Sequence, residues 1–99
     1  MELQDRLIIL FDYYENLLSD SQRDYFIDYY FNNLSLSEIA DNRGVSRNAV
    51  SKELKLAADK LNNYEEKLKL FDKDKRIKEL LINIDNKEIV RKINDILDE

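Results

Sequence analysis

The sequence predicts an all-α protein, and three observations carry this prediction. The chain of 99 residues contains no proline and a single glycine, so few residues would interrupt a helix. Its apolar residues recur at steps of three and four, the spacing of one face of a helix. Hydrophobic residues make up 43% of the chain, which is enough for a core although 37% of residues are charged. We therefore expect a single helical domain over residues 1–99.

Two amphipathic helices are expected in the first third of the chain. The first, over residues 3–18, carries apolar residues at steps of four, three, four and three: Leu3, Leu7, Leu10, Tyr14 and Leu17. The second is expected over residues 21–32. Ser19 or Asp20 is placed to cap its N-terminus.

The second helix is rich in aromatic residues. Its apolar face is made of four residues: Tyr25, Phe26, Tyr29 and Tyr30. Such a stripe can stack on nucleobases, but packing in the core explains it more simply. Asp24 and Asp28 are expected on the opposite, solvent-facing side, where they would repel phosphates.

Residues at about 36–56 have the pattern of a helix-turn-helix. Ser35 and Glu38 form a capping-box pair that opens a short helix. Ala40 is small enough for two helices to cross closely, and Gly44 can adopt the positive φ that ends the first helix.

A long second helix is expected after the turn. Val45 is predicted to pack against the core and hold the angle of the turn, and Ser46 to cap a helix over about residues 47–70. A heptad stripe runs along this helix: Val50, Leu54, Ala57, Leu61, Tyr64 and Leu68. Leu56 lies off the stripe and could contact a partner.

The start of this long helix, the reader helix of the motif, is the candidate nucleic-acid-binding site. With the heptad stripe turned inward, Asn48, Lys52 and Lys55 point outward. Arg47 lies at the helix start, where backbone N–H groups also favour a phosphate, and Ser51 is a further polar residue of the site. The basic side chains can hold phosphates, and an asparagine can read an adenine edge.

Two short helices are expected at the C-terminus. The run DKDKR at residues 72–76 is predicted to mark the start of the first. Asp85 with Glu88 resembles a capping box for the second. Their apolar residues fall at helical spacing: Ile77, Leu80, Leu81 and Ile84, then Ile89, Ile93, Ile96 and Leu97.

Composition argues against an enzyme. Cysteine and histidine are absent, which excludes a disulfide, a zinc finger, a cysteine nucleophile and a histidine base. Carboxylates are plentiful, but nothing marks a catalytic pair among them. We expect no catalytic residues, no metal and no cofactor. The chain has no apolar run near the roughly 20 residues that span a bilayer and no secretory pattern at its start, so a soluble cytoplasmic protein is expected.

The charge is distributed unevenly. The chain carries a net charge of -5, and residues 1–35 alone account for -5. Residues 36–70 carry +1 and residues 71–99 carry -1. Because electrostatics supply most non-specific affinity for nucleic acid, a monomer should bind DNA weakly. A homo-oligomer would add avidity.

Three separated blocks resemble the YlxM family of small bacterial helix-turn-helix proteins: LFDYYENLL at 10–18, SLSEIADNRGVSRNAV at 35–50 and YEEKLKLF at 64–71. The family's motif is similar to region 4 of RNA polymerase sigma factors, and LLSDSQRDYF at 17–26 resembles the segment that precedes the sigma reader helix. The family often has Gln and Tyr where this chain has Asn48 and Ser51, so only the motif positions are carried over.

The resemblance implies a non-enzymatic regulatory part in the signal recognition particle pathway, because family genes lie beside those of the particle's GTPase and its receptor. Contact with the particle's RNA or its GTPase is the implied mechanism. Two alternatives stay open. One is a transcriptional regulator that binds DNA as a dimer through the long helix or the last two helices. The other is a protein-interaction module that uses the acidic first helices.

Overall fold

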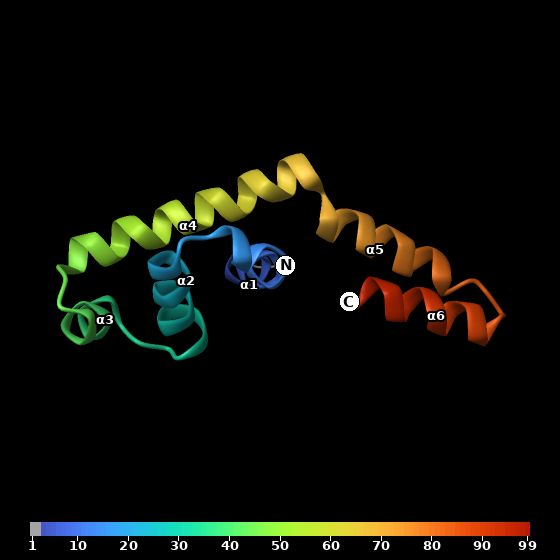
Figure 1. Ribbon diagram of the computed structural model, residues 1–99, viewed down its shortest axis with the longest axis horizontal. Helices are drawn as coiled ribbons and strands as arrows, with labels where there is room; N and C mark the ends of the chain where they lie inside the picture. The colour runs from blue at the N-terminus through green and yellow to red at the C-terminus, as the bar shows by residue number, and fades with distance from the viewer. Residues whose placement is uncertain (1–2) are drawn as a thin grey trace.

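The structure, a computed structural model, describes residues 3–99, and every regular element in that range is a helix (Figure 1). The prediction of an all-α fold is confirmed. The α-helices are α1 (Leu3–Tyr14), α2 (Asp20–Phe26), α3 (Leu36–Arg43), α4 (Arg47–Leu68), α5 (Leu70–Leu81) and α6 (Lys87–Leu97). A 3-10 turn (Glu15–Leu17) follows α1, and a π-helical turn (Ile27–Phe31) continues α2.

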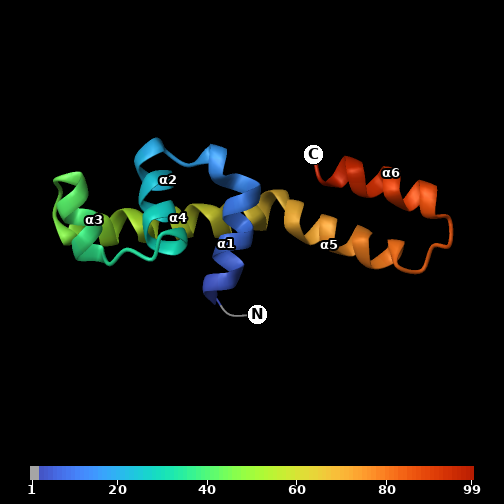
Figure 2. The same ribbon diagram turned by 90° about the horizontal axis from the view of Figure 1, so that it is seen from below.

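Helix α4 is the element on which the rest of the fold is arranged. Its 22 residues give it a length of about 33 Å. Helices α1, α2 and α3 pack on one side of it, and α1 runs across α4 rather than along it (Figure 2). Helices α5 and α6 form a hairpin beyond its C-terminal end, so the molecule measures 54 × 25 × 23 Å.

Two clusters of buried side chains hold the helices together. The larger one joins α1 and α2 to the middle of α4: Leu7, Leu10, Phe11, Tyr14, Leu18, Phe26, Ala57 and Leu61. Within it the rings of Phe11 and Phe26 stack with centroids 4.4 Å apart. The smaller cluster joins α3 to the start of α4: Ile39, Ala40, Val50 and Leu54. The first four positions of the predicted heptad stripe are therefore core residues, whereas Leu68 at its end is exposed.

Helix α2 begins with a capping box at Ser19, where a cap at Ser19 or Asp20 is expected from the sequence. The Ser19 hydroxyl accepts a hydrogen bond from the Gln22 backbone N–H at 3.2 Å, and the Gln22 side chain accepts one from the Ser19 backbone N–H. The expected helix over 21–32 is present, although its last turn widens into a π-helix. The prediction that Asp28 faces solvent is wrong, because this side chain is buried.

The break between α4 and α5 lies at Lys69, whose φ of 57° and ψ of 32° place it in the left-handed region. The prediction that DKDKR marks a helix start is therefore wrong, because residues 72–76 lie inside α5. The buried carboxylate of Glu65 accepts hydrogen bonds from the backbone N–H groups of Phe71 and Asp72. A side chain from α4 thus caps the first turn of α5.

Helix α6 packs mainly on α5. Its N-cap is Asn86, whose side-chain oxygen accepts a hydrogen bond from the Ile89 backbone N–H at 3.1 Å. The predicted cap at Asp85 is therefore displaced by one residue. None of the residues of α6 is fully buried.

Candidate nucleic-acid interface

Helix α3 is built as the sequence predicts. The Ser35 hydroxyl accepts a hydrogen bond from the Glu38 backbone N–H at 3.1 Å, and the Glu38 carboxylate accepts one from the Ser35 backbone N–H at 3.0 Å. These bonds, first of all the one from the Ser35 backbone, lower the pKa of Glu38. The buried Ile39 and Ala40 place α3 against Val50 of α4. The short helix is thereby fixed relative to the reader helix.

The turn between α3 and α4 is a Schellman-type C-cap. Gly44 has φ of 67° and ψ of 34°, and the Ala40 carbonyl accepts a hydrogen bond from the Val45 N–H at 3.1 Å. The prediction for Gly44 is confirmed. The prediction that Val45 packs into the core is wrong, because its side chain is 39% exposed. The angle of the turn is set instead by the backbone and by the Ser46 cap, which accepts from the Ala49 N–H at 3.0 Å.

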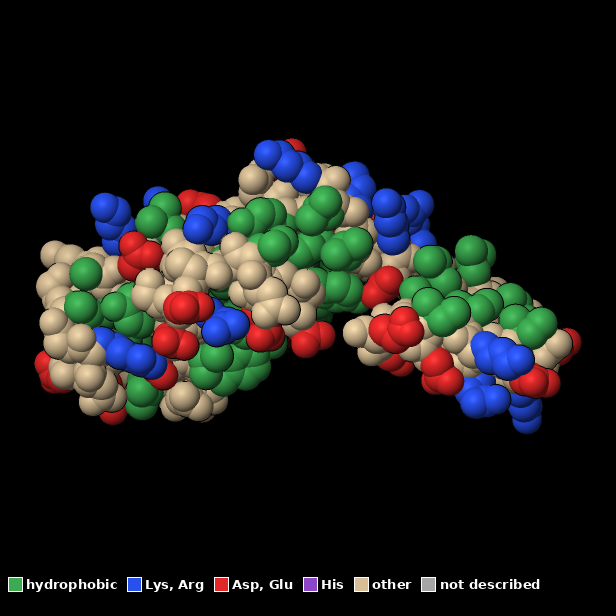
Figure 3. Space-filling model, in the orientation of Figure 1, with side chains coloured by type: hydrophobic (Ala, Val, Ile, Leu, Met, Phe, Trp, Pro, Cys, Tyr) green, Lys and Arg blue, Asp and Glu red, His purple; other side chains and the backbone are tan. Residues whose placement is uncertain are grey.

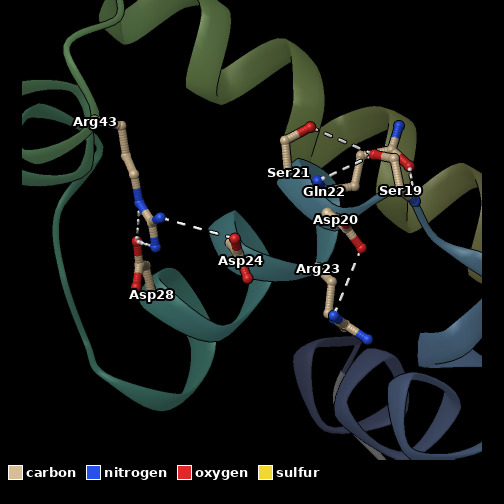
Figure 4. Close-up of polar contacts among 8 residues, drawn as sticks. All are labelled: Ser19, Asp20, Ser21, Gln22, Arg23, Asp24, Asp28 and Arg43. Atoms are coloured by element: carbon tan, nitrogen blue, oxygen red, sulfur yellow. Dashed lines mark hydrogen bonds and ion pairs between the residues drawn. The ribbon is translucent and has the colours of Figure 1, made fainter.

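An ion pair ties α3 to the end of α2, as Figure 4 shows. Arg43 donates from Nε and Nη2 to Oδ2 of Asp28, at 3.1 and 2.9 Å. Its Nη1 lies 3.8 Å from Oδ2 of Asp24. Hydrogen bonding to Asp28 raises the pKa of Arg43 above its ordinary value. The last residue of α3 is thus held by two carboxylates from the segment that precedes the motif.

The five residues predicted to bind nucleic acid lie on the first half of α4, and we call them the reader face. All five are exposed: Arg47, Asn48, Ser51, Lys52 and Lys55. Across residues 3–99 the structure gives none of the three basic side chains an ion pair. Their positive charges are therefore unneutralised by neighbouring carboxylates, as a phosphate-binding surface requires.

A shallow hollow of about 200 Å³ lies beside the reader face. Ser51 and Lys55 line it on one side, and Tyr29 and Tyr30 from the π-helical turn line it on the other. Tyr29 is 38% exposed, whereas burial raises the pKa of Tyr30. The aromatic stripe is thus divided, since Phe26 is a core residue and Tyr29 is available at the surface.

A larger cavity of about 610 Å³ lies away from the reader face, between α1, α5 and the C-terminus. Acidic residues dominate its lining: Asp12, Asp74, Asp98 and Glu99, with Tyr13 and Lys78. The Tyr13 hydroxyl donates to Asp74 at 2.7 Å, and burial followed by this bond raises the pKa of Tyr13. No group of acidic side chains within residues 3–99 has the arrangement of a metal site.

Together the capped α3, the left-handed turn and the exposed start of α4 define a helix-turn-helix protein, a class in which the second helix is offered to nucleic acid. The sequence profile of the UPF0122 family, described as "Putative helix-turn-helix protein, YlxM / p13 like", matches residues 1–99. The chain belongs to this family. The predicted resemblance is confirmed.

Individual relatives are similar over most of their length. A UPF0122 protein of Bacillus pumilus is 47% identical over 81 residues, which cover 82% of this chain and 74% of the relative. One from Ureaplasma urealyticum is 41% identical over 90 residues, or 91% of each chain. One from Malacoplasma penetrans is 42% identical over 94 residues, covering 95% of this chain and 81% of the relative.

Within residues 3–99, no helix combines the length and the apolar character that crossing a bilayer requires.

Proposed function

We propose that this protein is a non-enzymatic regulator of the signal recognition particle pathway that contacts the particle's RNA through the reader face. The single observation that carries nucleic-acid contact is the exposure of Arg47, Lys52 and Lys55 on one side of α4 without an ion pair among the described residues. The pathway is proposed from the family, whose genes accompany those of the targeting GTPase.

The surroundings of the reader face favour a structured RNA. The major groove of A-form RNA is too narrow for a helix, so proteins bind its backbone, loops and unstacked bases. The hollow lined by Tyr29 and Lys55 offers an aromatic ring beside a cation, a combination that suits an unstacked base and its phosphate. Residues 1–35 carry a net negative charge that repels phosphates, so RNA contact would be limited to the reader face.

The test is a pull-down of the tagged full chain from its own cells, with and without ribonuclease, followed by sequencing of the bound RNA. We expect the targeting RNA with the wild-type chain and its loss in a Lys52→Ala/Lys55→Ala variant. Lys67→Ala is the matched control, because Lys67 is exposed at the other end of the same helix. Equal recovery of the RNA by all three chains would refute the assignment of the reader face. Failure to recover the targeting RNA with the wild-type chain would refute the pathway.

If the particle's GTPase is recovered after ribonuclease treatment, the contact is with the protein component. The acidic first helices are a weaker candidate for such docking than the sequence suggested. Asp28 is committed to Arg43, so a charge reversal there would disturb the motif itself. Asp24 is half-exposed but lies 3.8 Å from the same guanidinium, so a charge reversal there would act on the same ion pair.

The second candidate is a DNA-binding transcriptional regulator that acts as a dimer. It is favoured by the clear solvent exposure of the first turns of α4, which is how such motifs present a helix to the major groove. Two-fold related copies would have to place their reader helices about 34 Å apart. The test is the electrophoretic mobility of genomic DNA fragments. A shift that depends on salt and on DNA sequence, and that is lost in the Lys52→Ala/Lys55→Ala variant, would support this function over the first.

A further inference from the structure

The hairpin of α5 and α6 exposes more apolar surface than its own packing uses. Leu81 is its only fully buried residue among those that the structure describes. Leu80 is 69% exposed and Ile96 is 65% exposed. Four further isoleucines of the hairpin are at least a third exposed: Ile77, Ile82, Ile84 and Ile89.

Some of these side chains share a side of their helix. In α5, Ile77 and Leu80 are three residues apart, and in α6, Ile89 and Ile96 are seven apart, so each pair lies on one side of its helix. Figure 3 shows hydrophobic side chains gathered over the hairpin and charged ones along its lower border. In α6, Val90, Ile93 and Leu97 are partly buried, whereas Ile89 and Ile96 are exposed.

We propose that the uncovered apolar face of the α5–α6 hairpin binds the same face of a second copy of this chain, forming a four-helix interface. Helices of 11 and 12 residues are marginal in isolation, and their stability comes from packing of an amphipathic face. The two helices have nearly equal lengths of about 17 and 18 Å, so a two-fold axis can set α5 of one copy along α6 of the other over their whole length.

The charge of the hairpin favours a second copy over a charged partner. Residues 71–99 carry seven bases and eight acids, and the acidic excess of the chain lies in residues 1–35 instead. Four of the seven bases are already paired within the hairpin: Arg76 with Asp72, Lys78 with Asp98, Lys92 with Glu88 and Arg91 with Asp95. The polar border therefore lacks the basic excess that a nucleic acid or an anionic membrane would select.

The size of the face agrees with a reversible dimer. Two helices side by side present a face roughly 18 Å long and roughly 20 Å wide, on the order of 350 Å². The exposed apolar side chains occupy part of this face. The face is smaller than the roughly 800 Å² that a standard interface buries on each partner. We therefore expect association that depends on concentration in the micromolar range.

The test is sedimentation velocity of the full chain over a concentration series. The mass should rise from 11.9 kDa toward twice that value. A Leu80→Lys/Ile96→Lys variant should keep its helical circular dichroism, since both side chains are exposed in the single chain. Its dissociation constant should rise roughly a hundredfold or more, because each interface would bury unpaired ammonium groups.

The matched control is Leu3→Lys/Leu17→Lys, which changes two exposed leucines outside the hairpin. This variant should dimerise as the wild-type chain does. A monomeric wild-type chain at every concentration would overturn the proposal, as would equal weakening by both double variants. Flotation of the wild-type chain with phosphatidylglycerol vesicles, lost in the hairpin variant, would overturn it in favour of a membrane. None of these outcomes bears on the reader face, so the proposed function is tested separately.

Discussion

The hydroxyl of Tyr14 donates a hydrogen bond to Oε1 of Glu65 at 2.6 Å, across 51 positions of sequence. The same carboxylate accepts from the backbone N–H groups of Phe71 at 3.1 Å and Asp72 at 3.0 Å. The Tyr14 oxygen in turn accepts from the Leu70 N–H at 3.1 Å. Tyr14 and Glu65 are both buried. This small network joins α1, α4 and the first turn of α5.

Removal of the Glu65 carboxylate should destabilise the fold. In Glu65→Ala the Tyr14 hydroxyl and two backbone N–H groups lose their acceptor, so we expect a loss of about 2–4 kcal/mol in the free energy of unfolding. Glu65→Gln keeps one acceptor oxygen and should lose less. Urea titration followed by circular dichroism measures both. Glu66→Ala, at the exposed neighbouring position, is the control, and equal stability of Glu65→Ala and Glu66→Ala would refute this role.

The ionisation of Tyr14 gives a pH-dependent signature of the same network. Burial, followed by the hydrogen bond to Glu65, raises the pKa of Tyr14 from 10.0 to about 12. A raised folded-state pKa means that the contribution to stability is complete below pH 10.0 and is lost as the pH rises through about 12. The difference in tyrosinate absorbance between the wild-type chain and Tyr14→Phe should have its midpoint near pH 12 when folded, and near the ordinary value in urea. A midpoint near the ordinary value in the folded chain would contradict the network.

The pairing of Arg43 with Asp28 should be measurable as coupling between α2 and α3. Arg43→Ala leaves the carboxylate of Asp28, whose side chain is 12% exposed, without its partner. Because the Arg43 side chain is itself 38% exposed, the expected loss is only about 1–2 kcal/mol. Arg23→Ala is the control, since its partner Asp20 is 97% exposed, and it should change stability by less than about 0.5 kcal/mol. Equal losses of stability in Arg43→Ala and Arg23→Ala would show that the Arg43–Asp28 pair does not stabilise the motif.

Two left-handed residues should respond in opposite directions. Gly44→Ala meets no atom within 4 Å of the added Cβ, so its cost is that of the backbone conformation alone, about 1–2 kcal/mol. Lys69 already has this conformation with a side chain, and Lys69→Gly should therefore stabilise the chain by up to about 1 kcal/mol. Thermal unfolding of both variants checks the signs. Stabilisation by Gly44→Ala would be incompatible with the positive φ.

Two substitutions on the reader face separate recognition of bases from recognition of phosphates. Lys52→Ala should weaken binding to all RNA sequences alike and reduce its salt dependence. Asn48→Ala should alter the preference among sequences while leaving the salt dependence unchanged. Filter binding at several salt concentrations with the targeting RNA and a scrambled RNA measures both. If both variants change sequence preference and salt dependence in the same way, Asn48 and Lys52 do not have separate roles in recognising bases and phosphates.

Local signals predicted the motif well. The capping box at Ser35, the glycine at position 44 and the cap at Ser46 act over three or four residues, so their geometry follows from the sequence around them. The heptad stripe likewise predicted which side of α4 is buried. The outward direction of Asn48, Lys52 and Lys55 followed from that stripe. The contact of the reader face with nucleic acid stays a prediction, as does the likeness to sigma region 4.

Three of the errors concern contacts between different helices. Asp28 is buried because Arg43, which lies 15 positions away, reaches it from another helix. The break at Lys69 is stabilised by Glu65 and Tyr14, and no breaker residue marks it. Val45 is exposed because α3 and α4 fill their interface without it. Periodicity reports which face of a helix is apolar, but it does not identify the polar residue that another element will cover.

Between Arg47 and Leu81 the backbone leaves the α-helical conformation at Lys69 alone. An unbroken rod over this stretch would be about 50 Å long, close to the full 54 Å of the molecule. The bend at Lys69 changes the direction of the chain after α4, while α4 and α5 each remain regular α-helices. The conformation of one residue thus sets the direction of the C-terminal hairpin relative to the helix-turn-helix.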